Sequence, residues 1–370
     1  MPKAKPKKRG TKPRKIRRTG AKREGQKLLL LDVHSDHSAL VACDEFGEVI
    51  LQMQVPTTRD GLRDVVEGIP GPKRVVYENG PMSALVNDAL KDLVDEIVST
   101  DPTRNALIAR SENSCDELDA YRLGMLDRAH GTYPVFVPDE PHRSLRSTLQ
   151  HDHVMADGMT AVKNRIKALL RRHGIPRRGR SPYQKQNRTE ITRQLPNAQW
   201  RWQLRSLWRQ MDWLRSERLA ARRQVRQICK KLPIVKRLRE IPGVGVLVAP
   251  TIVAWIVDPK RFGSRGELSA YGGLGLGQNI TGWKVMGRAR ASRRGQRELK
   301  RVLFIAARSS LNGRNALADR YHARIAAGWQ DKKAIRDLAR QILFIACAMM
   351  RTGKGYDRQR VNVPPVPGAA

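Results

Sequence analysis

The sequence predicts an α/β domain followed by a longer all-α region, and two observations support this. Between residues 27 and 100, short apolar runs bounded by turn residues alternate with helical patterns. Beyond residue 140, apolar residues recur at steps of three and four, which is the spacing of helices. A chain of 370 residues is long enough for two or three domains.

The composition points to a polyanionic partner. The formal net charge is +36, because 71 lysines and arginines face only 35 acids. Such a charge repels itself unless an anion neutralises it, and nucleic acid does so with release of counterions. An anionic membrane surface is the weaker alternative, since the basic residues are spread along the chain and not gathered on one amphipathic helix. A passive ribosome-associated binder stays open on charge alone.

Targeting and redox features predict a cytoplasmic protein without a membrane segment. No apolar run is long enough to span a bilayer, and no signal-type apolar segment follows the basic N-terminus. The cysteines show neither a CxxC pair nor histidine partners at zinc spacing. We expect reduced thiols, mostly in the core, at Cys43, Cys115, Cys229 and Cys347.

Residues 1–26 consist largely of Lys, Arg, Pro and Gly and have almost no apolar content. A segment of this kind cannot bury enough surface to order itself. We expect a flexible basic arm that lies along phosphates. A tail that only improves solubility is the alternative.

Residues 27–139 form the predicted α/β domain. Three runs joined by short turns are expected as hairpin-linked strands, and helices and strands alternate after them. This order is typical of a layered fold of the ribonuclease H type. The expected elements are strands at 28–32, 38–43 and 48–55, a helix at 58–67, a strand at 74–77, a helix at 81–93 and a strand at 95–99.

Residues 140–234 predict two long helices, at 140–174 and 198–231, joined by a loop at 175–197. The second helix carries a heptad seam that Arg218 interrupts. We expect an antiparallel hairpin or a coiled-coil dimerisation arm. Three tryptophans fall partly off the seam; they can stack on bases, but packing is the favoured use of Trp202, Trp208 and Trp213.

Residues 235–352 predict a compact helical domain that ends in an apolar helix at 335–350, before a flexible tail at 353–370. The run Ile241–Gly245 resembles the hairpin of a helix-hairpin-helix element. There Gly243 and Gly245 permit a tight turn, so that amides at the next helix N-terminus meet a phosphate. An ordinary glycine turn between helices is the alternative.

Four acids are the candidate metal ligands. Asp32 and Glu78 each end a predicted strand, where the sheet edge opens. Asp116 and Asp119 have the i, i+3 spacing of one helix face. Clustered carboxylates suit Mg²⁺ or Mn²⁺, and two such ions can stabilise both oxygens of a phosphoryl transfer. The alternative is a structural role for each acid, with Asp116 as a helix N-cap.

A hydroxyl nucleophile is suggested at Thr281, which follows a glycine-rich stretch and precedes a basic run. Flanking cations favour attack on phosphorus, although a threonine in such a loop is far more often a turn residue. The expected nucleic-acid contacts in the basic run are Lys284, Arg288, Arg290, Arg293 and Arg294.

Taken together and in order, these motifs resemble the DEDD transposase family of bacterial insertion sequences, which includes the pilin-gene invertase. The likeness covers about residues 27 to 352. It is carried by Leu31-Asp32-Val33-His34, Val76-Tyr77-Glu78-Asn79-Gly80, Cys115-Asp116-Glu117-Leu118-Asp119-Ala120, Ile241-Pro242-Gly243-Val244-Gly245, Arg261-Phe262, Tyr271-Gly272-Gly273-Leu274, Thr281-Gly282 and Arg294-Gly295-Gln296-Arg297-Glu298-Leu299-Lys300.

The resemblance implies a domain like that of the Holliday-junction resolvases, with its acid tetrad at Asp32, Glu78, Asp116 and Asp119. It also implies a C-terminal transposase domain whose serine links covalently to a 5′-phosphate, in a composite site with another subunit. Donor and target DNA, a noncoding bridge RNA, and a homodimer or homotetramer at the bacterial nucleoid are the partners and setting that it implies.

The chain departs from the family pattern at the nucleophile, because Thr281-Gly282 stands where Ser-Gly is usual. The added methyl stiffens χ1 and crowds attack. Three readings follow: a working threonine nucleophile, a resolvase-like metal-dependent nuclease without a covalent intermediate, or a decayed, non-catalytic nucleic-acid binder. Nearby Ser292 fits a different family position.

Overall fold

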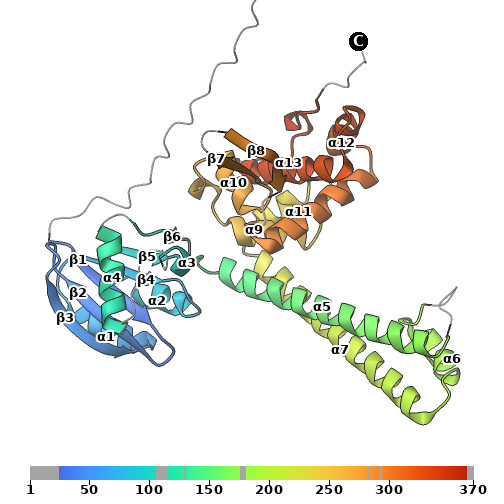
Figure 1. The fold of residues 1–370 in the computed structure, drawn as a ribbon, viewed down its shortest axis with the longest axis horizontal. Coiled ribbons are helices and arrows are strands. Elements are labelled where there is room, and N and C mark those ends of the chain that lie inside the picture. The colour runs from blue at the N-terminus through green and yellow to red at the C-terminus, as the bar shows by residue number, and fades with distance from the viewer. Residues whose placement is uncertain are drawn as a thin grey trace, which may run out of the picture. The chain divides into compact units, whose positions relative to one another are not determined.

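The computed structural model describes residues 25–105, 116–128, 131–175, 181–281, 284–291 and 294–364. Within these ranges, the structure does not describe the side chains of residues 104–105, 116–119, 122, 277–281 and 284–291. The chain divides into two compact units, Met1–Val137 and Pro138–Ala370 (Figure 1). The five-part division expected from the sequence stays a prediction.

The first unit is built on one mixed sheet with strand order β3-β2-β1-β4-β5-β6. The neighbours β1, β4 and β5 are parallel, whereas β2, β3 and β6 run antiparallel to their partners. This arrangement confirms the mixed α/β layer and is consistent with a ribonuclease H type of fold. The strands are β1 Lys27–Val33, β2 His37–Cys43, β3 Val49–Pro56, β4 Lys73–Glu78, β5 Glu96–Thr100 and β6 Pro134–Val135.

Helices cover both faces of this sheet, which is why β1 is an unbroken apolar run and not an alternating one. Leu29 and Leu31 pack against α1 and α2, and Leu28 and Leu30 pack against α4 on the other face. The hydroxyl of Thr58 caps α1 by accepting from the Gly61 amide at 3.1 Å. The helices are α1 Arg59–Gly68, α2 Ser83–Leu90, α3 Pro102–Asn105 and α4 Asp116–Arg128.

The second unit contains the long helical hairpin of α5 His142–Arg172 and α7 Ala198–Cys229. Buried side chains such as Ile166 and Leu204 form its seam, and the amide of Trp200 donates to the N-cap residue Asn197 at 3.0 Å. The hairpin is confirmed within one chain; self-association through it stays a prediction. The expected loop at 175–197 is wrong in part, because it holds η1 Lys185–Asn187 and α6 Arg188–Arg193, which pack on α7.

Two details of α7 differ from the sequence pattern. Arg218 breaks the apolar seam because it meets a buried acid: its Nε lies 3.3 Å from Asp152, which is 1% exposed. The expectation that all three tryptophans pack is right only for Trp208. Trp202 and Trp213 are 65% and 58% exposed.

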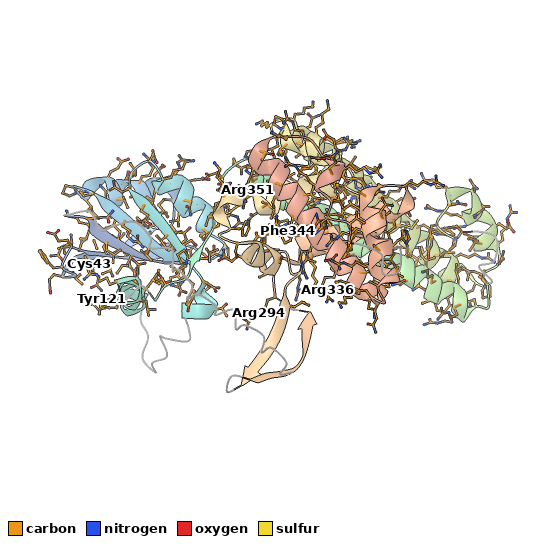
Figure 2. The ribbon with its side chains drawn as sticks, turned by 90° about the horizontal axis from the view of Figure 1, so that it is seen from above. Cys43, Tyr121, Arg294, Arg336, Phe344 and Arg351 are labelled. Carbon is orange, nitrogen blue, oxygen red and sulfur yellow. The ribbon has the colours of Figure 1, made fainter. Side chains whose placement is uncertain are left out.

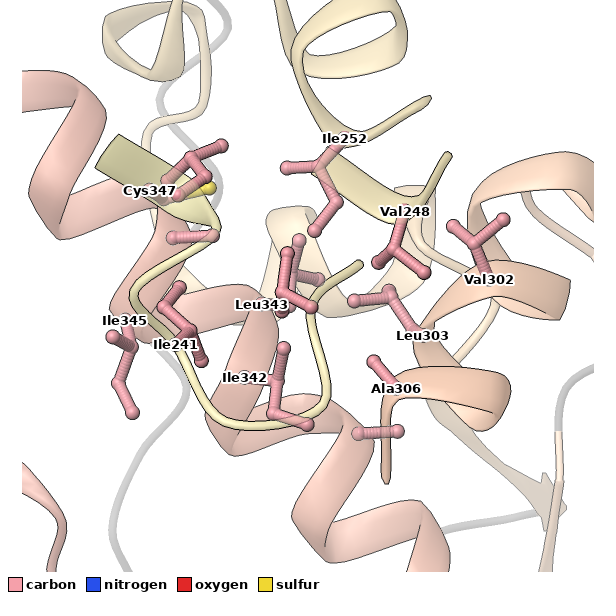
Figure 3. Close-up of a cluster of buried hydrophobic side chains, with 14 of the residues drawn as sticks. Ile241, Val248, Ile252, Val302, Leu303, Ala306, Ile342, Leu343, Ile345 and Cys347 are labelled. Carbon is pink, nitrogen blue, oxygen red and sulfur yellow. The ribbon is translucent and has the colours of Figure 1, made fainter. Parts of the chain in front are cut away.

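The rest of the second unit is a helical body around one apolar core (Figure 3). The expected apolar helix is confirmed as α13, at Asp331–Thr352, and supplies Ile342 and Leu343 to that core. The remaining elements are α8 Ile234–Leu238, α9 Val248–Ile256, η2 Pro259–Arg261, α10 Arg265–Tyr271, α11 Arg297–Ser309, η3 Ser310–Asn312, α12 Ala316–Ala326 and η4 Arg358–Arg360.

The all-helical expectation for this region is wrong at one place. Residues Leu276–Thr281 and Lys284–Ala291 form the antiparallel strands β7 and β8, where the glycine content had suggested a loop. Figure 2 shows this hairpin standing out from the helices of its unit. Backbone pairing between the two strands satisfies amides and carbonyls that a loop would expose to water.

Among the described helices, none combines the length and apolar content that a bilayer span requires.

Candidate active site and nucleic-acid interface

The sheet brings Asp32 and Glu78 together at one edge. Strands β1 and β4 are parallel neighbours, and Leu31 pairs with Tyr77. The next residue is Asp32 on β1 and Glu78 on β4, and neighbouring strands lie roughly 4.8 Å apart. Two carboxylates that are 46 residues apart in sequence thus meet at the carboxyl ends of the central strands.

Both acids are on the sheet face that α4 covers. Side chains alternate along a strand, and the α4-facing residues two positions earlier are Leu30 and Val76. Asp32 and Glu78 continue these two rows past the end of the apolar core. This places them on the face where the N-terminal end of α4 would complete a site.

The direction of α4 is fixed by contacts at its C-terminal end. The guanidinium of Arg74, near the start of β4, donates to the Asp127 carboxylate at 3.0 and 3.1 Å. Arg128 donates to the backbone carbonyls of Phe46 and Asp44. The helix therefore ends where β1 and β4 begin, and it starts where these strands end. Figure 2 shows Tyr121 on this helix.

The lengths of helix and strand agree with this geometry. From Arg74 to Glu78 is roughly 13 Å along a strand, and from Asp127 back to Asp119 is roughly 12 Å along a helix. Asp116 lies four positions before Ala120, and Asp119 lies four positions before Leu123. Ala120 and Leu123 are both buried and face the sheet. Helical periodicity therefore puts both backbone positions on the stripe that faces the sheet. Their side chains lie outside the described residues.

The end of β4 is held by a hydrogen-bonded network beside Glu78. The amide of Asn79 donates to the carbonyl of Thr100 at 2.8 Å, and its side-chain oxygen accepts from Ser83 and Ser99 at 3.1 and 3.3 Å. Tyr77 anchors the same segment by donating to the Ser83 carbonyl at 3.2 Å. Burial raises the pKa of this tyrosine.

His34 is a neighbour of the site that sequence reasoning named only as part of a motif. Its Nε2 lies 3.1 Å from the Asp32 carboxylate, and the two side chains are 53% and 27% exposed. The two-residue spacing on one strand face was the available signal. The imidazole is placed to orient this carboxylate.

The donor set at this edge suits a hard divalent cation. Carboxylate oxygens are the ligands that Mg²⁺ prefers, and an ion that keeps several waters needs an open site. Asp32 is partly exposed and Glu78 is exposed. Among the described side chains alone, no group of three or more histidines, cysteines, aspartates or glutamates is placed to hold a metal. Asp116 and Asp119 would have to complete the set.

The residues expected at the nucleophile belong to the second unit. Thr281 ends β7 and pairs with Lys284, the first residue of β8, which also carries Arg288 and Arg290. The side chains of these four residues lie outside the description, as does the whole of Arg293. Arg294 is described and exposed. The sequence predictions for these residues stand untested.

The glycines of the helix-hairpin-helix motif have a visible packing role. Gly243 has a φ of +84°, and a Cβ there would lie 2.2 Å from the Ala306 carbonyl and 2.7 Å from the Ser310 amide. Only glycine allows this approach to the end of α11. A Cβ at Gly245 would meet open space. Phosphate binding at this turn stays a prediction.

The motif residues Arg261 and Tyr271 cap the C-terminal end of α9. Arg261 donates to the carbonyls of Ile256 and Trp255 at 3.0 and 2.9 Å, and the Tyr271 hydroxyl donates to Trp255 at 3.0 Å. Arg146 of α5 adds a bond to the Ala254 carbonyl at 2.7 Å. Cationic donors at a helix C-terminus satisfy orphan carbonyls. These two motif residues therefore help to hold the helical body together.

Comparison with known proteins finds similarity to transposases in two separate segments of the chain. The proteins described as the transposase IS116/IS110/IS902 family match at residues 235–323, and a group of IS110-type DEDD proteins, described as transposase, matches at 31–175. The chain is 30% identical over 141 residues to the insertion element IS110 uncharacterized 43.6 kDa protein of Streptomyces coelicolor, covering 38% of this chain and 35% of that protein.

A second relative is the pilin gene-inverting protein of Moraxella lacunata, 28% identical over 123 residues, with 33% of this chain and 38% of that protein aligned. The chain thus spans little more than a third of the length of these curated relatives. The family matches nevertheless fall on the segments that hold the four acids and the glycine turn. Two segments of the chain, residues 31–175 and 235–323, are thus similar to transposases of the IS110, IS116 and IS902 insertion elements.

Proposed function

We propose that this chain is a DNA recombinase that moves an insertion sequence by cutting and rejoining DNA strands. The observation that carries the proposal is the meeting of Asp32 and Glu78 at the ends of two parallel strands, on the sheet face toward which the N-terminus of α4 points. The net charge of +36 supports a nucleic-acid substrate.

Asp32, Glu78, Asp116 and Asp119 would hold the divalent cation, Mg²⁺ or Mn²⁺. When bound, such an ion neutralises the charge that develops on a phosphate in transfer. The protein's own part is to fix the carboxylates: the Asn79 network holds the end of β4, and the Arg74–Asp127 pair fixes α4 along the sheet. His34 orients the Asp32 carboxylate.

The Thr281 hydroxyl serves as the nucleophile in this proposal. Its oxygen bonds to the 5′-phosphorus, the bond from phosphorus to the 3′ oxygen breaks, and the threonine proton ends on that departing oxygen as a hydroxyl. The resulting phosphothreonine keeps the energy of the phosphodiester, so rejoining to a new 3′ hydroxyl needs no added nucleotide. Guidance by a bridge RNA, and a homodimer or homotetramer with a composite site, complete the proposal.

The test is strand exchange with purified protein, element-end RNA and matching donor and target duplexes in Mg²⁺. Glu78→Gln should abolish both cleavage and exchange, while Glu67→Gln, which removes an exposed acid from α1 of the same unit, should leave both intact. Equal activity of the two variants would remove the carboxylate site from the mechanism.

The denatured reaction products separate this proposal from a nuclease that uses water. A recombinase with a threonine nucleophile leaves a protein–DNA adduct that maps to Thr281 by mass. Products that are cleaved yet never protein-linked, together with an active Thr281→Val variant, would favour the resolvase-like nuclease. Binding without metal-dependent cleavage would favour the decayed transposase.

A further inference from the structure

The tip of the helical hairpin forms a cationic cavity. There the short helix α6 packs on α7, at the end of the hairpin that lies away from α9 (Figure 1). The cavity has a volume of about 470 Å³ and is lined by two threonines, Trp208 and five arginines: Arg188, Arg193, Arg201, Arg205 and Arg209. Among the described residues, no carboxylate lines it.

The arginines divide into two groups. Arg188 is held by the Asp212 carboxylate at 2.5 and 2.7 Å, and Arg201 donates to the Leu195 carbonyl at 3.0 Å. The other three, Arg193, Arg205 and Arg209, form no hydrogen bond or ion pair within the described part of the chain. Guanidinium groups present paired donors that match phosphate oxygens. The cavity therefore suits an anion.

The wall of the cavity is rigid. Trp208 is 3% exposed, and its indole nitrogen donates to the Pro182 carbonyl at 2.8 Å. The Arg188 guanidinium lies over this ring, 5.3 Å from its centroid, and is also hydrogen-bonded to Asp212. The guanidinium groups of Arg188 and Arg201 are thus held in place by the protein itself.

Two exposed indoles lie on α7 beside Arg209 of the cavity. Trp202 and Trp213 are 65% and 58% exposed, and eleven residues, about three helical turns or 16 Å, separate them. Arg209 follows Trp202 by seven positions and precedes Trp213 by four, so all three share one stripe. This stripe lies opposite the buried seam residues of α7. The fold leaves these large aromatic surfaces open to solvent.

We propose that the hairpin tip binds an unpaired stretch of nucleic acid, with phosphates in the arginine cavity and bases stacked on Trp202 and Trp213. Stacking on indole requires bases that are not buried in a duplex, and it tolerates any sequence. The proposal rests on the proposed function, because a recombinase that opens its strands or uses a guide RNA supplies such a segment. A second copy of this face is disfavoured, since it would bring two arginine clusters of the same charge together.

The test measures binding of labelled single strands to full-length protein in the presence of EDTA. The probes are oligouridylate and oligodeoxythymidylate of about 12 nucleotides, within the usual site size of single-strand binders, and a duplex of equal length. Trp202→Ala with Trp213→Ala should weaken single-strand binding at least tenfold, while Trp202→Phe with Trp213→Phe should keep most of it, because phenylalanine still stacks.

The arginines are tested by the salt dependence of the same binding. Arg205→Ala with Arg209→Ala should lower the slope of log affinity against log salt by about 1.4, or about 0.7 for each lost phosphate contact. The matched control is Arg223→Ala with Arg226→Ala, which removes the same charge from exposed positions further along α7. Equal effects of the two double variants would mean diffuse attraction and would overturn the proposal.

Three further results would also overturn it: an unchanged affinity of the double alanine tryptophan variant, a preference for the duplex probe, or conversion of an oligomer to monomers by the tryptophan variants in sedimentation. The last would make this face a contact between copies of the chain. Because both tryptophans are exposed, circular dichroism and thermal unfolding of the variants should match the parent chain. Preference for the RNA or the DNA probe identifies the source of the strand.

Failure of this inference can be told apart from failure of the proposed function. Glu78→Gln should lose strand exchange yet keep single-strand binding in EDTA, because the acid lies in the first unit. A parent protein that binds single strands but never exchanges them would leave the hairpin-tip site standing while the proposed function falls.

Discussion

At position 281, the side-chain methyl group of threonine bears on the proposed nucleophilic attack by the hydroxyl. Threonine keeps the hydroxyl of the family's usual serine, but its branched Cβ restricts χ1 and crowds the approach to phosphorus. We expect Thr281→Ser to speed adduct formation about tenfold, which corresponds to about 1.4 kcal/mol in the barrier. Thr281→Val should abolish the adduct, because it removes the oxygen and keeps the shape.

The measurement is the rate at which a nicked DNA substrate becomes linked to protein, followed on denaturing gels. Ser292→Ala provides the control, since this nearby hydroxyl fits a different position in the family pattern. An adduct that survives Thr281→Val and disappears with Ser292→Ala would move the nucleophile to the second residue.

Cys347 is a residue whose ionisation depends on the fold. Burial raises the pKa of its thiol from about 9 to about 12. The folded pKa lies above the unfolded one, so this contribution to stability is complete below pH 9 and is lost as the pH rises toward 12. We expect the midpoint of thermal unfolding to fall with pH in that window, and Cys347→Ala should flatten the fall.

Reaction with a thiol reagent at pH 8 gives an independent check. Cys347, and Cys229 whose pKa burial raises to about 11, should react only after unfolding. Fast labelling of Cys347 in the folded chain, located by peptide mass, would contradict the burial seen in the core.

At the scale of single elements, α4 depends on a glycine. A Cβ at Gly124 would lie 2.3 Å from a methyl carbon of buried Leu30. Replacing a helical glycine by alanine usually gains about 1 kcal/mol, whereas overpacking a core costs about 1–3 kcal/mol. We expect Gly124→Ala to destabilise the first unit by about 1–2 kcal/mol, because the contact outweighs the propensity.

Urea unfolding of a double-mutant cycle tests this reasoning. Leu30→Ala makes room for the new methyl, so the cost of Gly124→Ala should shrink in that background. The same variant should weaken Mg²⁺ binding if α4 carries two of the ligands. Purely additive costs would show that helix and strand do not meet at this point.

The hairpin of α5 and α7 depends on a buried charge. Asp152 is 1% exposed and holds Arg218 and Arg222, with closest approaches of 3.3 and 3.1 Å. Loss of the acid leaves two partly buried cations without a partner, which costs several kcal/mol in fully buried pairs. Because both arginines are partly solvated, we expect Asp152→Ala to cost about 1–3 kcal/mol.

Chemical unfolding followed by helical ellipticity measures this loss. Asp157→Ala, at an exposed position on the same helix, is the matched control and should stay within about 0.5 kcal/mol of the parent chain. If both variants lose equal stability, the cost comes from helix α5 and not from the buried pair.

At the scale of the whole molecule, we expect the net charge of +36 to dominate the proposed binding of DNA. Each phosphate that meets a lysine or arginine releases counterions, so affinity for duplex DNA should fall steeply with salt. With six or more contacts we expect a loss of about a thousandfold or more between 50 and 200 mM salt. A titration at several salt concentrations measures the slope, and a flat response would exclude the charge as the source of affinity.

The sequence by itself determined most of the strands and long helices and their order, whereas α6, β7 and β8 lie where loops were predicted. Leu28 to Leu31 are apolar without a break because both faces of β1 are covered, and that run alone predicted a buried strand. The heptad spacing of α7 likewise predicted a long helix, since helical periodicity is a local property of the chain, but it left an intrachain hairpin and a dimerisation arm open. Asp32 and Glu78 were found as acids at the ends of predicted strands, and Asp116 and Asp119 by their i, i+3 helical spacing.

Only the tertiary structure decided which of these residues meet. Strand register put Glu78 beside Asp32, and the Arg74–Asp127 pair oriented α4 toward them. Arg218 interrupts the apolar seam of α7 because it pairs with Asp152 of α5. The glycine-rich stretch that was predicted as a loop leads into β7, which pairs with β8. Pairing partners distant in sequence supply these energies, so no local pattern of residues contains them.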